Sequence, residues 1–169
     1  YKQYDVKRGL RNADGTGVLA GVTRICNVHG YVMEAHERRP AEGRLFYRGI
    51  DIRDLIEGCT AEDRFGFEEV VWLLLFGYLP TAEQLSGFTR LLEQHRELPE
   101  GFIEDMIIKA PSPNIMNKLA RSVLALYSYD ELAEDMSLEN IVRQSIELIA
   151  RVSTIMVNAY QVKKRYYDH

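Results

Sequence analysis

Histidine is the side chain best suited to acid–base chemistry and metal binding near neutral pH, and this chain has four. They are His29, His36, His95 and His169. No two of them lie three or four residues apart, and no His-Glu-x-x-His run occurs, so their spacing does not predict a metal site. His36 lies in a charged run, and His95 lies near the expected end of a helix, where a cation is favoured. We therefore expect structural or surface roles for all four and no metal centre.

The two cysteines, Cys26 and Cys59, fit no disulfide framework and no metal-ligand spacing. Neither has a neighbouring histidine that would favour a thiolate, so we expect both to pack as small apolar side chains. A reducing, cytoplasmic setting is the expected location. The sequence also lacks a Gly-x-Ser-x-Gly elbow, a dinucleotide fingerprint and a Walker sequence. Residue type and spacing alone therefore predict no complete catalytic set.

One basic group precedes a glycine-rich turn. Lys7, Arg8 and Arg11 come before residues 14–17, which read Asp-Gly-Thr-Gly. The guanidinium fork of arginine suits phosphate, whereas basic residues near a terminus are often simply solvated. Both interpretations stay open on chemistry alone.

Composition excludes several classes of protein. The chain has 169 residues, 46% of them hydrophobic, with 21 basic and 25 acidic residues and a net charge of −4. These values are typical of a globular domain with one sizeable core, and the absence of a basic stripe argues against a nucleic-acid partner. The longest apolar run, residues 70–76, is far shorter than the roughly 18 residues of a membrane span. We expect neither a membrane segment nor a signal peptide.

The hydrophobic pattern divides the chain into residues 1–50, an arm with a short β-ribbon, and 51–169, a helical part. Strands are expected at 18–26 and 45–49, with a loop over 29–43 between them. The first helix is expected to end at Gly58. The next, 66–76, is apolar on every side, which predicts complete burial before Gly77 ends it.

The later helices have clear start signals. Thr81 and Gln84 form a capping box, and we expect the helix that they open to close at Leu98 and Pro99. Shorter helices are expected at 101–109 and 114–127. The longest begins after Ser137, a good N-cap. It carries two adjacent apolar stripes, which predict a helix placed between two layers, one of which could be a second chain.

Four stretches together resemble the amino-terminal part of the citrate synthase family. They are Gly-Leu-Arg at 9–11 with the run 17–25, then 42–56, 67–85 and 117–126. The most specific motifs are Tyr-Arg-Gly-Ile-Asp-Ile at 47–52 and Leu-Leu-Phe-Gly-Tyr-Leu-Pro-Thr at 74–81. The resemblance covers nearly the whole chain. It implies a mainly α fold: part of a multi-helical citrate-synthase-like large domain with a small N-terminal β-ribbon.

The resemblance also implies an activity. The family condenses acetyl-CoA with oxaloacetate to give citrate and CoA, with acetyl-CoA as a substrate and no other cofactor. Its members are homodimers, which implies a subunit contact through the helices at about 114–127 and 137–165. In some members the arginine at the position of Arg11 lies near the phosphates of CoA, so Arg11 is the one binding residue that the resemblance suggests.

The catalytic residues of the family have no counterparts here. The family's His-Gly-Gly-Ala-Asn run is missing, and none of the four histidines matches a catalytic one. The resemblance therefore implies a fragment without the small domain and catalytic half, inactive alone. Two alternatives remain: a fragment of 2-methylcitrate synthase, which uses propionyl-CoA, or a non-catalytic helical dimerisation module.

Overall fold

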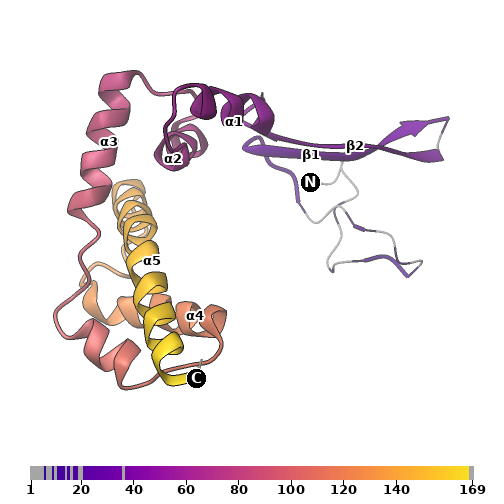
Figure 1. Ribbon diagram of the computed structural model, residues 1–169. Coiled ribbons are helices and arrows are strands. Elements are labelled where there is room, and N and C mark those ends of the chain that lie inside the picture. The colour runs from indigo at the N-terminus through magenta and orange to yellow at the C-terminus, as the bar shows by residue number, and fades with distance from the viewer. Residues whose placement is uncertain are drawn as a thin grey trace. The chain divides into compact units, whose positions relative to one another are not determined.

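The structure is a computed structural model that describes residues 6, 9, 11–13, 15, 17–18, 21–35 and 37–167 (Figure 1). His36, His169, Lys7 and Arg8 lie outside the described residues. The chain forms two compact units, Tyr1–Leu85 and Ser86–His169. Its elements in order are β1 (Cys26–Glu34), β2 (Glu37–Tyr47), β3 (Ile50–Asp51), α1 (Ile52–Ala61), α2 (Phe67–Phe76), α3 (Ala82–Gln94), η1 (Ile103–Ile108), α4 (Ile115–Leu126), η2 (Tyr127–Tyr129) and α5 (Leu138–Tyr167). Helices dominate, which confirms the expected mainly α fold with a small β-ribbon. The division expected after residue 50 stays a prediction.

The β-ribbon is longer than expected and begins later. β1 and β2 pair antiparallel from Cys26 with Tyr47 to Glu34 with Glu37, and β3 extends the sheet at the last two residues of β2. The expected strand at 18–26 and the expected loop at 29–43 were therefore wrong. Residues 21–25 are irregular, and the supposed loop forms most of the hairpin. Pro40 is tolerated because the edge of β2 opposite β1 is unpaired at that position in the described chain.

Local signals end the helices of the first unit. Asp51 caps α1 by accepting the Arg53 N–H at 3.0 Å, and the helix continues beyond Gly58 to Ala61, contrary to our expectation. Gly58 does not end α1 because its carbonyl still accepts a backbone bond, from the Glu62 N–H. Gly77 ends α2 as predicted, in the left-handed conformation with φ of 87°.

The prediction that α2 is buried on every side was wrong. Leu73 is its one buried residue, whereas Leu75 is 36% exposed and Phe76 44% exposed. The physical reason is that the described chain supplies neighbours to only part of the surface of this helix.

The capping box at α3 is confirmed: the Thr81 N–H donates to Gln84 Oε1 at 2.9 Å, and the Gln84 N–H donates to Thr81 Oγ at 3.3 Å. The helix ends at Gln94 rather than at Leu98, because His95 turns out of it and its ring contacts the Leu91 carbonyl at 2.8 Å. Ser137 caps α5 as expected by accepting the Asn140 N–H at 3.3 Å.

The core of the second unit lies where α5 packs on η1 and α4. Phe102, Ile107, Ile155 and Ala159 form its buried cluster. η1 is a π-helix, which the expected ordinary helix at 101–109 did not anticipate. The first half of α5 leaves Leu138, Ile141 and Leu148 exposed, so the second layer predicted for this helix is not supplied by the described residues. Within the described part, no helix is both long and apolar enough to cross a membrane.

Candidate functional site

Arg11, the residue suggested as a phosphate ligand, lies in the described part of the arm and is exposed. Its Nη1 donates to the Gly15 carbonyl at 2.9 Å, and its backbone forms an isolated antiparallel bridge with Gly17. The side chain therefore helps to close the glycine turn. A guanidinium has five N–H donors, so this single bond leaves donors that could contact an anion.

The structure does not bring the described histidines into an acid–base pair. His29 lies on β1, where its ring meets Phe46 edge-on with centroids 5.7 Å apart. His95 is held by the Leu91 carbonyl after α3. Among the described residues, no group of three or more His, Cys, Asp or Glu side chains could hold a metal ion.

The cysteines differ in environment. Cys59 is buried, and its Sγ lies 3.4 Å from a Glu69 carboxylate oxygen and 3.4 Å from Arg64 Nη1. Burial, followed by the bond to Glu69, raises the pKa of the Cys59 thiol, which disfavours a thiolate. Cys26 is exposed, so the expectation that both cysteines pack in the interior was wrong for Cys26. It lies at the start of β1, all nine residues of which are exposed.

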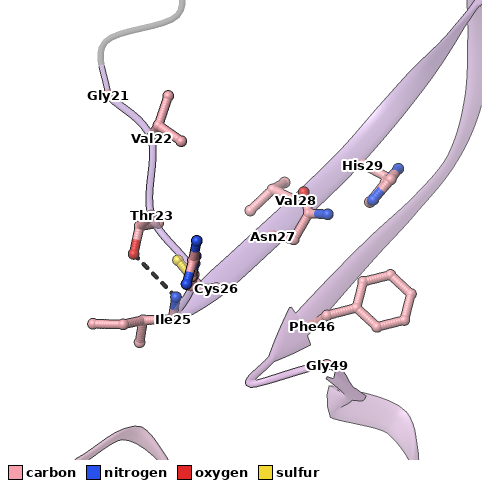
Figure 2. A pocket seen from close by; sticks show the side chains of 11 residues that line it. Gly21, Val22, Thr23, Ile25, Cys26, Asn27, Val28, His29, Phe46 and Gly49 are labelled. Atoms are coloured by element: carbon pink, nitrogen blue, oxygen red, sulfur yellow. Dashed lines mark hydrogen bonds between the residues drawn. The ribbon is translucent and has the colours of Figure 1, made fainter. Parts of the chain in front are cut away.

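A cavity of about 750 Å³ lies beside the base of β1 (Figure 2). It is lined by residues 21–29 with Phe46 and Gly49. Arg24, Asn27 and His29 supply polar side chains, and none of the described lining residues is acidic. Thr23 Oγ accepts the Ile25 N–H at 3.0 Å and fixes the segment that leads into β1. The charge of this lining suits an anionic group.

The Tyr-Arg-Gly-Ile-Asp-Ile motif has a structural role that its residue types did not reveal. Arg48 donates from Nε and Nη2 to the Leu74 carbonyl, at 3.2 and 2.7 Å, near the end of α2. Asp51 accepts both Nε and Nη2 of Arg44, at 3.0 and 2.7 Å. The bond from the Arg53 backbone N–H, followed by that from Arg44, lowers the pKa of Asp51. The motif therefore ties the base of the hairpin to α1 and α2.

A polar cluster in the second unit was also missed. Asp130 accepts from Arg143 Nη2 at 2.8 and 2.9 Å and from Gln144 Nε2 at 2.9 Å. Arg143 reaches Glu147 at 2.9 Å, and Glu147 binds Arg151 at 3.0 Å. Residues 143, 147 and 151 are four apart along one helix, and this spacing is the sequence pattern that could have predicted their ion pairs. These charges neutralise one another, and Asp130, Glu147 and Arg151 line one side of a groove of about 410 Å³ that is otherwise lined mainly by apolar residues.

The comparisons with known proteins agree with this architecture. Residues 11–168 match the family model described as citrate synthase, C-terminal domain. The chain therefore belongs to the citrate synthase family.

Two curated relatives and one solved structure illustrate the likeness. The chain is 27% identical over 159 residues to a citrate synthase of Saccharolobus solfataricus, covering 94% of this chain and 36% of that protein. It is 31% identical over 163 residues to 2-methylcitrate synthase 1 of Corynebacterium glutamicum, covering 95% and 36%. The crystal structure of citrate synthase from Pyrobaculum aerophilum aligns with a TM-score of 0.68 and 26% identity, covering 95% of this chain and 40% of that one. The chain spans about a third of the length of these curated relatives.

Proposed function

We propose that the chain is part of an acyltransferase that joins the methyl carbon of acetyl-CoA to the ketone carbon of oxaloacetate, giving citrate and CoA. The match of residues 11–168 to the family carries this proposal. In the family's chemistry an aspartate and a neutral histidine enolise the thioester, a second histidine polarises the ketone, and water hydrolyses the CoA intermediate. This chemistry needs no cofactor beyond the substrates and neither nucleic acid nor membrane as a partner. We place the enzyme in the cytoplasm, where Cys26 and Cys59 stay reduced.

A 2-methylcitrate synthase is the second candidate, because a relative of that activity matches as much of the chain as the citrate synthase relative does. The test is a thiol-release assay with oxaloacetate and either acetyl-CoA or propionyl-CoA. It is run on this chain and on the longer protein that contains it. Faster turnover of acetyl-CoA by the longer protein supports the first candidate, and faster turnover of propionyl-CoA supports the second.

This chain alone should be inactive, because its described histidines are not paired with a carboxylate. Activity of the chain by itself would contradict this and would make one of its histidines catalytic. A longer protein without activity on either thioester would favour the non-catalytic dimerisation module.

Arg11 is proposed to contact the phosphates of CoA. In the longer protein, Arg11→Ala should raise KM for acetyl-CoA by about tenfold, because a charge-assisted hydrogen bond contributes about 1.5–3 kcal/mol. The kcat should change little. Arg90→Ala, which removes an exposed arginine of α3, is the matched control. An unchanged KM in the Arg11 variant would refute the proposal.

The chain is also proposed to dimerise through α4 and α5. Met116, Leu124 and Tyr127 are 70%, 75% and 59% exposed and follow one another at helical spacing along α4 and its end. Leu124 and Tyr127 also line the groove of about 410 Å³. Leu124→Asp should abolish this contact, because it places a carboxylate in an apolar interface. A Leu124 variant whose mass in solution equals that of the unmodified chain at all concentrations would refute it.

A further inference from the structure

β1 lies at the edge of the sheet. It pairs with β2 alone, so its other edge has no partner strand within the described chain. All nine of its residues are exposed. A strand of this length presents a row of unpaired N–H and C=O groups and is a template for a further strand. Beyond the two residues of β2 that pair with β3, the hairpin has only two strands in the described chain, and a two-stranded ribbon is marginal by itself, so a further strand would stabilise it.

The two strands of the hairpin differ in how their edges are protected. β2 has its own unpaired edge beyond β3, and it carries Pro40 together with the charged residues Glu37, Arg38, Arg39, Glu42 and Arg44. Proline and charge are the features by which proteins prevent pairing at an edge. β1 has no proline, lysine or arginine. It has one histidine, His29, and its one carboxylate, Glu34, is its last residue. The edge of β1 is therefore the one suited to pairing.

We propose that this edge pairs with β1 of a second copy of the chain, antiparallel and centred on Gly30. This register overlaps all nine residues and sets Val28 opposite the partner's Val32, a favourable pair of β-branched side chains. The two Glu34 carboxylates then lie at opposite ends, about 27 Å apart and beyond the Debye length. A parallel pairing would instead place them side by side.

Charge complementarity selects a second copy as the occupant. In this register the end of the partner's hairpin comes alongside Cys26–His29, the residues of β1 that line the cavity of about 750 Å³ (Figure 2). The partner's Glu34 lies opposite Cys26, two residues from Arg24. Arg24 lines the same cavity and makes no ion pair within the described residues. Glu34 shares only an exposed ion pair with Arg39 in its own hairpin, which leaves the carboxylate able to reach Arg24.

Two matched variants of the 169-residue chain test the pairing. V28E/V32E places carboxylates opposite one another at both pairs, whereas V28K/V32E places opposite charges there. Within one hairpin, Val28 lies across from Leu45 and Val32 from Arg39, so both variants put the same carboxylate across from Arg39. They differ at position 28 alone, which separates pairing from hairpin stability. We expect V28E/V32E to weaken self-association by about tenfold or more, and V28K/V32E to restore it to within about threefold.

Analytical ultracentrifugation with Leu124→Asp separates this contact from the proposed helix dimer. The helix contact and the β1 pairing use different surfaces, so both together make the unmodified chain assemble beyond a dimer, whereas the Leu124 variant forms a dimer through β1 and its combination with V28E/V32E is a monomer. Dissociation by V28E/V32E without any effect of Leu124→Asp supports the β1 pairing and refutes the helix dimer. A monomeric Leu124 variant, or equal behaviour of the two β1 variants, overturns the β1 pairing. Open-ended aggregation of the Leu124 variant would overturn it as well, because a single two-fold contact closes at a dimer.

A crosslink tests the register directly. In a Leu124→Asp, Cys26→Ser background, Gly30→Cys places two thiols at the two-fold axis, where paired Cα atoms lie about 4.5–5.5 Å apart and a disulfide fits. Gly30 has no heavy atom within 4 Å of an added Cβ, so the substitution fits the hairpin. Oxidation should give covalent dimers, whereas Gly43→Cys on β2, which has equal space, should not. Equal crosslinking of both variants would overturn the register.

Discussion

At the scale of single residues, Lys118 shows how a buried charge is held. It is 3% exposed, and its Nζ donates to the carbonyl oxygens of Met106 and of Ala110, the latter at 2.7 Å. Loss of hydration on burial, and then the charge of Arg121, lower the pKa of Lys118. The two carbonyls keep the ammonium in place, at and just after the end of η1.

Lys118→Met should lower the free energy of unfolding by about 1–3 kcal/mol, because two carbonyls lose their donor while the volume is kept. Urea titration measures the change. Lys164→Met, on an exposed position of α5, should change it by less than about 0.5 kcal/mol. If both variants were as stable as the unmodified chain, the proposed role of Lys118 would be wrong.

Asp130 predicts a pH dependence. The hydrogen bond from Gln144, then those from the Leu132 N–H and Arg143, lower the pKa of Asp130 below its ordinary value of 3.8. A lowered pKa in the folded state means that the carboxylate stabilises the fold above pH 3.8. That stability is lost as the pH falls through the lower, folded-state value. Asp130→Asn should therefore be less stable than the unmodified chain at pH 7, and the difference should shrink in acid. Urea midpoints at pH 7 and pH 3 test this, and an equal difference at both would contradict it.

At the scale of elements, Arg48 joins the hairpin to α2. Its backbone has a φ of 50°, an uncommon value outside glycine, and its side chain binds the Leu74 carbonyl with two N–H groups. The strained turn and the helix end therefore stabilise each other.

Arg48→Ala should cost about 1–2 kcal/mol and speed hydrogen exchange of the amides at 75–78, because the end of α2 loses its cap. Arg48→Lys should recover less than half of the loss, since an ammonium cannot reproduce the planar fork. Urea titration and exchange mass spectrometry measure both. Full recovery by lysine would mean that charge, not fork geometry, holds the helix end.

At the scale of the whole molecule, the two units bury different amounts of apolar surface. The buried core cluster lies within the second unit, whereas Leu55, Cys59 and Leu73 are the buried apolar residues in the described part of the first. The first unit should therefore be the less stable of the two.

Trp72, the one tryptophan of the chain, belongs to the first unit. Its fluorescence should change at a urea concentration about 1 M below the midpoint of far-ultraviolet circular dichroism, to which both units contribute. Moving the probe with Trp72→Phe and Tyr129→Trp should shift the fluorescence transition above the circular dichroism midpoint, because Tyr129 contacts Phe102 in the more stable second unit. Coincident transitions in the unmodified chain would show a single cooperative unit instead.

The sequence by itself determined where several helices begin and where α2 ends, although it misplaced the ends of α1 and α3. Gly77, the pair Thr81 and Gln84, and Ser137 act through hydrogen bonds that span at most four residues, so their effects follow from local sequence. The family likewise followed from the order of motifs along the chain, which needs no coordinates. The sequence also shows directly that the family's catalytic histidine motif does not occur within the 169 residues.

The tertiary structure alone decided which surfaces those elements share. The alternation of residues 26–47 did not show that they form one hairpin, because pairing depends on a partner strand and on the bulge near Gly30. Apolar residues all around α2 did not make it buried, because burial depends on neighbours from elsewhere in the fold. Arg48 binds a carbonyl 26 residues away, and this hydrogen bond forms only after folding. The same holds for the hydrogen bonds of Arg143 and Gln144 to Asp130. Local sequence fixes short-range hydrogen bonds, whereas long-range packing sets burial, charge pairing and the open edge of β1.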